Sequence, residues 1–222
     1  MKRLTTTTLK WIAVVTMLVD HIAATAQLPY GLYVVMRSIG RLSFPLFAFV
    51  LVEGFIHTRN RKRYLVRIFV FALITEVCFD LAFYQSWFDF SHQNVLFTFL
   101  ISLFVLLGYE RSHDKVLGIV LVLLGMYVAL ILKTDYDLFG ILMIFNFYYN
   151  RNRVKHLVLF HTVINLFMAL LFTPIQLFAV FSLPLITLYN GKKGKGMKYF
   201  FYIFYPGHLL LLYCLQIWGS FI

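Results

Sequence analysis

Charged residues are scarce in this sequence. Asp, Glu, Lys and Arg make up 13% of its 222 positions, whereas soluble domains carry about 25%. Hydrophobic residues account for 61% instead. This composition excludes an ordinary water-soluble domain and indicates a protein that folds in a lipid bilayer.

Cysteine is also rare, and the chain has only Cys78 and Cys214. Both lie inside apolar runs that are far apart in the sequence. Neither belongs to a CxxC pair or to the Cys/His spacing of a metal site. We therefore expect two buried thiols, with no disulfide and no metal.

Apolar runs fill nearly the whole chain. A transmembrane helix needs roughly 20 mostly apolar residues, and runs of about this length alternate with short polar breaks. The runs lie near residues 10–28, 32–56, 64–84, 92–109, 116–133, 136–149, 156–172, 174–189 and 198–220. They predict an all-α, polytopic transmembrane helix bundle of about nine spans, in a single domain over residues 1–222. Two short runs widen the predicted count to eight to ten spans.

Lys and Arg gather in every second polar break, at residues 57–63, 110–115, 151–156 and 191–198. Cytoplasmic loops of membrane proteins carry such an excess, so the pattern predicts a cytoplasmic N-terminus. The formal net charge of +11 then reflects topology, and we expect no nucleic-acid partner. The basic stretch at 191–196 is expected to contact anionic membrane lipids.

Ionisable residues inside the runs are the most informative feature. Each charge at bilayer depth costs about 2.5–3.5 kcal/mol, so it needs a partner, a water-filled cavity or a function. Lys10 and His21 are eleven residues apart, which places them on one helix face about 16 Å apart along the axis. Asp20 points about 100° away from His21 and suits a partner on another helix. A helix-packing His21 and a lipid-anchoring Lys10 are the alternatives.

Two further charged pairs have helical spacing. Arg37 and Arg41 lie four residues apart in the second run, and Glu76 and Asp80 do so in the third. Because these runs would form a hairpin, we expect the arginines to pair with these carboxylates. Such a buried ladder has either a structural or a functional role.

Other polar residues are expected to cap or join helices. Asn94 and His92 open the fourth run and suit a helix cap. His161, Asn165 and His208 lie in later runs, where hydrogen bonds between helices are the default interpretation.

Several segments in the first half of the chain resemble the TraX family of conjugal-transfer membrane proteins. They are MLVDH at Met17–His21, IGRLSFPLFAF at Ile39–Phe49, VEGF at Val52–Phe55, TRN at Thr58–Asn60, YLVR at Tyr64–Arg67 and NVLFT at Asn94–Thr98. The segment Glu76–Asp80 departs from the proline-containing version usual in that family. Beyond about residue 110 the resemblance lies in hydrophobic pattern and length.

The resemblance implies an enzyme of the bacterial cytoplasmic membrane that acetylates the N-terminal amine of a pilin subunit. It also implies similarity to membrane acyltransferases that use cytoplasmic acyl-CoA. Those enzymes carry a basic residue, ten intervening residues and a histidine in the first span, and Lys10 with His21 matches that pattern. The expected acceptor is a pilin-like peptide, with a glycan or a lipid as alternatives.

On this basis we expect acetyl-CoA to be the acyl donor. Its phosphates would bind Lys10 and the basic cytoplasmic loop, at Arg59, Arg63 and Arg67. The slender pantetheine arm of the coenzyme would then extend along the first helix to His21.

The catalytic residues expected from the resemblance are His21, Arg41, Asp20 and Glu76. His21 would act as general base or transient acyl carrier. Arg41 would stabilise charge on the thioester oxygen, while Asp20 or Glu76 would orient a partner. A transporter or ion-conducting protein is one alternative function, and a non-catalytic assembly factor is another.

Overall fold

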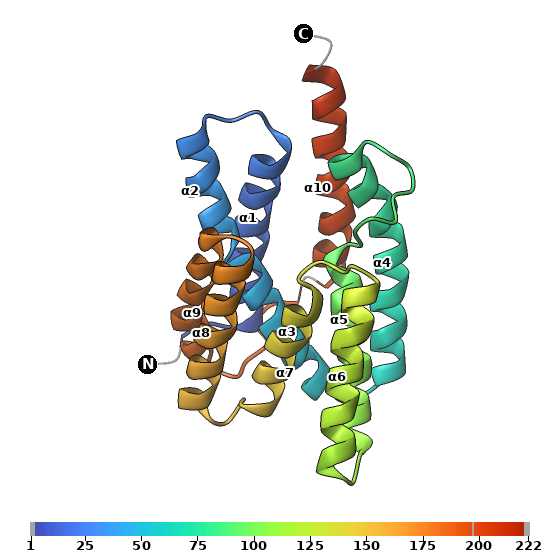
Figure 1. Cartoon of the computed structure of the whole chain (residues 1–222), viewed down its shortest axis with the longest axis vertical. Coiled ribbons are helices and arrows are strands. Elements are labelled where there is room, and N and C mark those ends of the chain that lie inside the picture. Colours follow the sequence, from blue (N-terminus) through green and yellow to red (C-terminus); the bar gives the residue numbers. More distant parts are fainter. Residues whose placement is uncertain (1–2, 197, 220–222) are drawn as a thin grey trace. The chain divides into compact units, whose positions relative to one another are not determined.

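The computed structural model describes residues 3–196 and 198–219. Its helices (Figure 1) are α1 Thr6–Thr25, α2 Tyr30–Gly40, α3 Ser43–His57, α4 Arg61–Tyr84, α5 Val95–Arg111, α6 Lys115–Ile131, α7 Asp137–Tyr149, α8 Val154–Leu171, the 3-10 helix η1 Pro174–Phe181, α9 Ser182–Thr187 and α10 Lys198–Gly219. Extended pairing in the described part is limited to two isolated bridges. The predicted all-α class is confirmed.

Each predicted apolar run corresponds to helical structure, but two runs are divided. The second run contains α2 and α3, separated by a turn at Arg41 and Leu42. The run at 174–189 contains η1 and α9.

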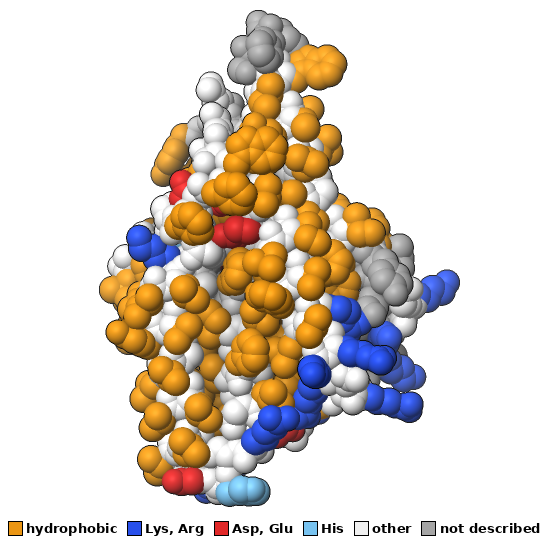
Figure 2. All heavy atoms as spheres, turned by 90° about the vertical axis from the view of Figure 1, so that its right-hand side faces the viewer, with side chains coloured by type: hydrophobic (Ala, Val, Ile, Leu, Met, Phe, Trp, Pro, Cys, Tyr) orange, Lys and Arg blue, Asp and Glu red, His pale blue; other side chains and the backbone are white. Residues whose placement is uncertain are grey.

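The surface of these helices suits lipid. Within the described residues, four helical segments have the length and apolar composition to cross a membrane, namely Thr6–Thr25, Tyr30–His57, Val154–Leu171 and Phe200–Gly219. Hydrophobic side chains also cover most of the face drawn in Figure 2. Large exposed apolar areas are uncommon on soluble monomers, so the chain is a membrane protein.

The chain forms two compact units. Unit 1 comprises Met1–Val50, Val77–Phe88 and Asn165–Ile222, and unit 2 comprises Leu51–Glu76 and Asp89–Ile164. The boundaries fall within α3, α4 and α8.

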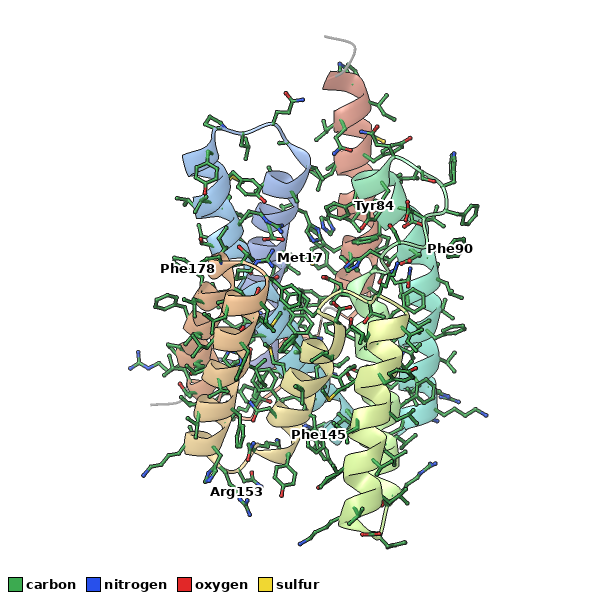
Figure 3. All side chains as sticks on the ribbon, in the orientation of Figure 1. Met17, Tyr84, Phe90, Phe145, Arg153 and Phe178 are labelled. Atoms are coloured by element: carbon green, nitrogen blue, oxygen red, sulfur yellow. The ribbon has the colours of Figure 1, made fainter. Side chains whose placement is uncertain are left out.

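In unit 1, α1 packs against both α2 and α10. The short connection after α1 makes α2 its antiparallel neighbour (Figure 1). Met17 of α1, labelled in Figure 3, is buried, with 6% of its surface exposed. Gly40 permits the close approach of α2, since a Cβ atom there would lie 2.0 Å from Oδ1 of Asp20.

We therefore expect Gly40→Ala to destabilise unit 1. The added methyl group would overlap Asp20, and overpacking of this kind costs about 1–3 kcal/mol. Gly31→Ala is the matched control on the same helix, because nothing lies within 4 Å of its Cβ position. Thermal unfolding in detergent should show a lower midpoint for Gly40→Ala alone, and equal midpoints for the two variants would contradict this packing.

Unit 2 is built around helices α5, α6 and α7, which all contact one another. Its apolar core contains Val105, Val122, Ala129 and Ile141. At the end of α3, the carboxylate of Glu53 is bound by the guanidinium of Arg151 through contacts of 2.7 and 3.2 Å. This fork joins α3 to the turn between α7 and α8.

Both cysteines are free thiols. Cys78 is partly buried, but Cys214 is exposed on α10. The prediction that both are buried is therefore wrong for Cys214, because an apolar run in a membrane protein also supplies lipid-facing positions.

Candidate functional site

Helices α1 and α10 bring two histidines together in unit 1. Nδ1 of His21 lies 2.8 Å from Nε2 of His208. The two rings are nearly parallel, with an interplanar angle of 11° and centroids 5.0 Å apart. On its other side, Nδ1 of His208 lies 2.8 Å from the carbonyl oxygen of Phe204. These atoms form a chain of two hydrogen bonds that ends at His21.

These two hydrogen bonds determine which ring nitrogens of His21 and His208 carry a proton. A carbonyl oxygen only accepts, so Nδ1 of His208 must carry a proton and donate it. A neutral imidazole has one donor and one acceptor nitrogen, so Nε2 of His208 accepts from Nδ1–H of His21. The lone pair of His21 is therefore on Nε2.

Nε2 of His21 is available for chemistry. It has no hydrogen-bond partner among the described residues, and His21 is only partly buried. An imidazole nitrogen with a free lone pair can take a proton or attack a carbonyl carbon.

Aromatic rings surround the two histidines. Phe83, in the last turn of α4, presents its ring edge-on to His21 at 5.4 Å. Tyr205 lies 6.2 Å from the His21 ring, and Phe204 stacks on His208 at 4.8 Å. An apolar wall of this kind strengthens the hydrogen bonds it encloses by lowering the local dielectric.

Asp20, the neighbour of His21, binds two arginines. Its Oδ2 atom lies 2.6 Å from Nη1 of Arg37, and its Oδ1 atom lies 2.9 Å from Nη2 of Arg41. All three side chains are less than one quarter exposed. Two guanidinium groups against one carboxylate leave one positive charge in excess next to His21 on α1.

The partner of these arginines differs from the prediction. We expected Arg37 and Arg41 to pair with Glu76 and Asp80, but both form ion pairs with Asp20, so the prediction is wrong for the partner of Arg37. The reason is that α2 packs directly on α1, which brings both arginines to Asp20. The expectation that Asp20 points toward another helix is confirmed.

Glu76 has a different role in unit 2. Its carboxylate accepts hydrogen bonds from the backbone N–H of Asn94, at 3.0 Å, and from the Asn94 side-chain amide. Asn94 in turn accepts from the N–H of Leu96 and caps α5, as predicted. Nearby, Nε2 of His92 lies 3.8 Å from Oδ1 of Asp135.

A polar path leads from Arg41 to other helices of unit 1. Nη1 of Arg41 lies 3.4 Å from Oε1 of Gln176, and the amide of Gln176 donates to Oδ1 of Asn165 at 3.0 Å. Gln176 is 2% exposed and Asn165 is fully buried. Sequence reasoning missed Gln176, although an amide inside an apolar run just after Thr173 and Pro174 was a usable signal.

Lys10 lies on the same side of α1 as His21. Its Nζ atom is 5.1 Å from the centre of the Phe201 ring on α10, a cation–π contact. Since His21 also contacts α10 through His208, the predicted common face of Lys10 and His21 is confirmed.

The other predicted donor-binding residues belong to unit 2. Arg59 lies in the connection between α3 and α4, while Arg63 and Arg67 lie on α4. Arg59 and Arg63 are exposed, whereas the Arg67 guanidinium lies 5.7 Å from the ring centre of Tyr64.

Comparison with known proteins identifies the family. The sequence model of the TraX protein family matches residues 5–216, a range that includes both histidines and Asp20. A protein of Dichelobacter nodosus, named as a probable fimbrial assembly protein FimC of serogroup H1, is 32% identical over 233 residues and matches 92% of each chain. No solved structure matches the chain. The chain is therefore a member of the TraX family.

Proposed function

We propose that the protein is a membrane acetyltransferase that moves an acetyl group from cytoplasmic acetyl-CoA to the N-terminal amine of a pilin-like peptide. The observation that carries this proposal is the accessible lone pair on Nε2 of His21, fixed by His208. The fimbrial name of the relative supports a pilin-like acceptor, and TraX membership supports acetylation as the reaction.

His21 acts as the general base in this reaction. The amine nitrogen attacks the thioester carbonyl carbon, and its proton passes to Nε2 of His21. The carbon–sulfur bond then breaks, and the imidazolium returns the proton to the thiolate. The products are the acetylated amine and free CoA, and His21 ends in its starting state.

His208 acts as a positioning residue. It accepts the Nδ1 proton of His21 throughout the reaction and so keeps the lone pair on Nε2. When His21 becomes an imidazolium, the same bond becomes charge-assisted and therefore stronger.

The group formed by Asp20, Arg37 and Arg41 supplies positive charge. Its excess charge favours the negative oxygen that develops on the thioester carbonyl, with Arg41 as the donor and Asp20 as its anchor. Glu76, which caps α5 through Asn94, has a structural role in this proposal.

The protein resides in the bacterial cytoplasmic membrane with its N-terminus in the cytoplasm and about nine spans. The alternating basic breaks between the apolar runs support this orientation. Lys10, at the start of α1, then lies at the cytoplasmic end of the site.

The test is acetyl transfer by the purified protein in lipid nanodiscs. Radiolabelled acetyl-CoA is supplied with a synthetic pilin-like peptide whose N-terminal amine is free, or with the same peptide blocked at that amine. We expect label on the free peptide only. Label no higher than in protein-free nanodiscs, for both peptides, would refute the proposed activity.

A further inference from the structure

The start of α1 is covered by a basic segment, Asn190–Gly196, which we call the basic strap. Backbone N–H groups of Thr6 and Thr7 donate to the carbonyls of Lys192 and Lys193 at 3.0 and 3.1 Å. The Thr7 hydroxyl lies 2.8 and 2.7 Å from the carbonyls of Lys193 and Lys195. The strap is thus tied to α1 through its carbonyls, and these bonds already occupy the N–H groups at the helix end.

The backbone path of the basic strap requires glycine at residue 194. Gly194 has φ +75°, and a Cβ atom there would lie 2.5 Å from Oγ1 of Thr5 and 3.1 Å from Cβ of Thr7. Gly191 also has a positive φ, of +77°. A side chain at Gly194 would both strain the backbone and push the strap away from α1.

The lysines of the strap have an excess of positive charge around them. Lys192, Lys193 and Lys195 are exposed, and Lys193 repels the ammonium group of Lys10. Arg3 is a further basic residue close to the strap, since its backbone N–H donates to the carbonyl of Leu188.

No carboxylate of unit 1 neutralises this charge. The segments of unit 1 contain only two acidic residues, Asp20 and Asp80, and residues 138–222 contain none. Asp20 is engaged by two arginines. Within the described residues, none of the three strap lysines forms an ion pair. The counter-charge for the strap lysines must therefore come from outside unit 1.

We propose that the basic strap and Lys10 bind the phosphate groups of the acyl donor. This inference rests on the proposed function and assigns the donor's nucleotide to the strap instead of to Arg59, Arg63 and Arg67. Ammonium groups are common phosphate ligands. The site also lies at a suitable distance, because Lys10 is about 16 Å along the helix axis from His21, a separation that the pantetheine arm can span.

The phosphates of a lipid headgroup share this chemistry, so the test must separate the two sources. The probe is adenosine 3′,5′-diphosphate, which carries nucleotide phosphates without the thioester arm. Its Kd is measured by calorimetry on the full protein, in nanodiscs of phosphatidylcholine alone and of phosphatidylcholine with phosphatidylglycerol. Bound phosphatidylglycerol is measured by native mass spectrometry.

The test variant replaces Lys192, Lys193 and Lys195 by Gln. The control replaces Lys115, Arg153 and Lys155 by Gln and removes the same charge from exposed positions of unit 2. We expect the Kd to rise at least about tenfold in the strap variant, a loss of roughly 1.4 kcal/mol, and to stay within about twofold in the control. An unchanged Kd in the strap variant, with loss only of bound phosphatidylglycerol, would show a lipid contact and overturn the proposal.

A second pair of variants keeps every lysine. Gly194→Ala should weaken nucleotide binding because it displaces the strap, whereas Gly196→Ala should not, since nothing lies within 4 Å of its Cβ position. Equal nucleotide binding by both variants would contradict the requirement that the strap be held against α1.

Strap-dependent nucleotide binding without acetyl transfer would leave the phosphate site standing and refute only the proposed function. Acetyl transfer together with nucleotide binding that does not depend on the strap would refute the phosphate site and leave the proposed function standing.

Discussion

His21→Gln is expected to lower the turnover of acetyl transfer by about 10²–10⁴-fold, the range that a general base contributes. The amide of Gln has no basic nitrogen, so it cannot take the proton of the attacking amine. Donor affinity should change little, because the phosphates bind elsewhere. The measurement is the initial rate of peptide acetylation, with nucleotide binding determined in parallel.

The control for this prediction is His156→Gln, which changes an exposed histidine on α8. It should retain wild-type turnover. Turnover by His21→Gln equal to that of the control would remove His21 from the mechanism. Acid quenching of a single turnover followed by mass spectrometry distinguishes a base from an acyl carrier, since only the carrier would show an acetyl group on His21.

His208→Leu is expected to lower kcat by about 10²-fold, the scale of a misoriented catalytic group, with KM for acetyl-CoA unchanged. Leucine cannot accept the Nδ1 proton of His21, so the His21 tautomer and ring orientation would no longer be fixed. His208→Gln should recover most of the turnover, because its Oε1 atom can accept that proton.

A purely structural role for His208 predicts a different pattern. Both substitutions would then lower the unfolding temperature, and turnover would follow the fraction of folded protein. Peptide acetylation and thermal unfolding are therefore measured on the same preparations. Equal losses of kcat in His208→Leu and His208→Gln, at equal stability, would contradict a role for hydrogen bonding to His21.

The helices could be predicted from the sequence because a bilayer leaves few options for the backbone. Its N–H and C=O groups must be satisfied within the segment, so long apolar runs indicate helices. The break between α2 and α3 was not visible in hydropathy. Pro45 has no N–H to donate to the carbonyl of Arg41, which accounts for an interruption at residues 41–42.

The candidate site could be predicted only in its local part. Helical periodicity placed Lys10 and His21 on one face and turned Asp20 toward another helix. The partners came from tertiary structure, since His208 is 187 residues from His21 in sequence. No local pattern shows which polar residue of α10 meets α1, or that Asp20 binds Arg37.

The most direct measurement is a structure of the protein in nanodiscs with coenzyme A bound. We expect the thiol sulfur within contact distance of Nε2 of His21 and the nucleotide phosphates at Lys10 and the basic strap. A bound coenzyme whose thiol lies away from His21, outside the reach of its ring, would contradict the central claim that this nitrogen faces the reacting thioester.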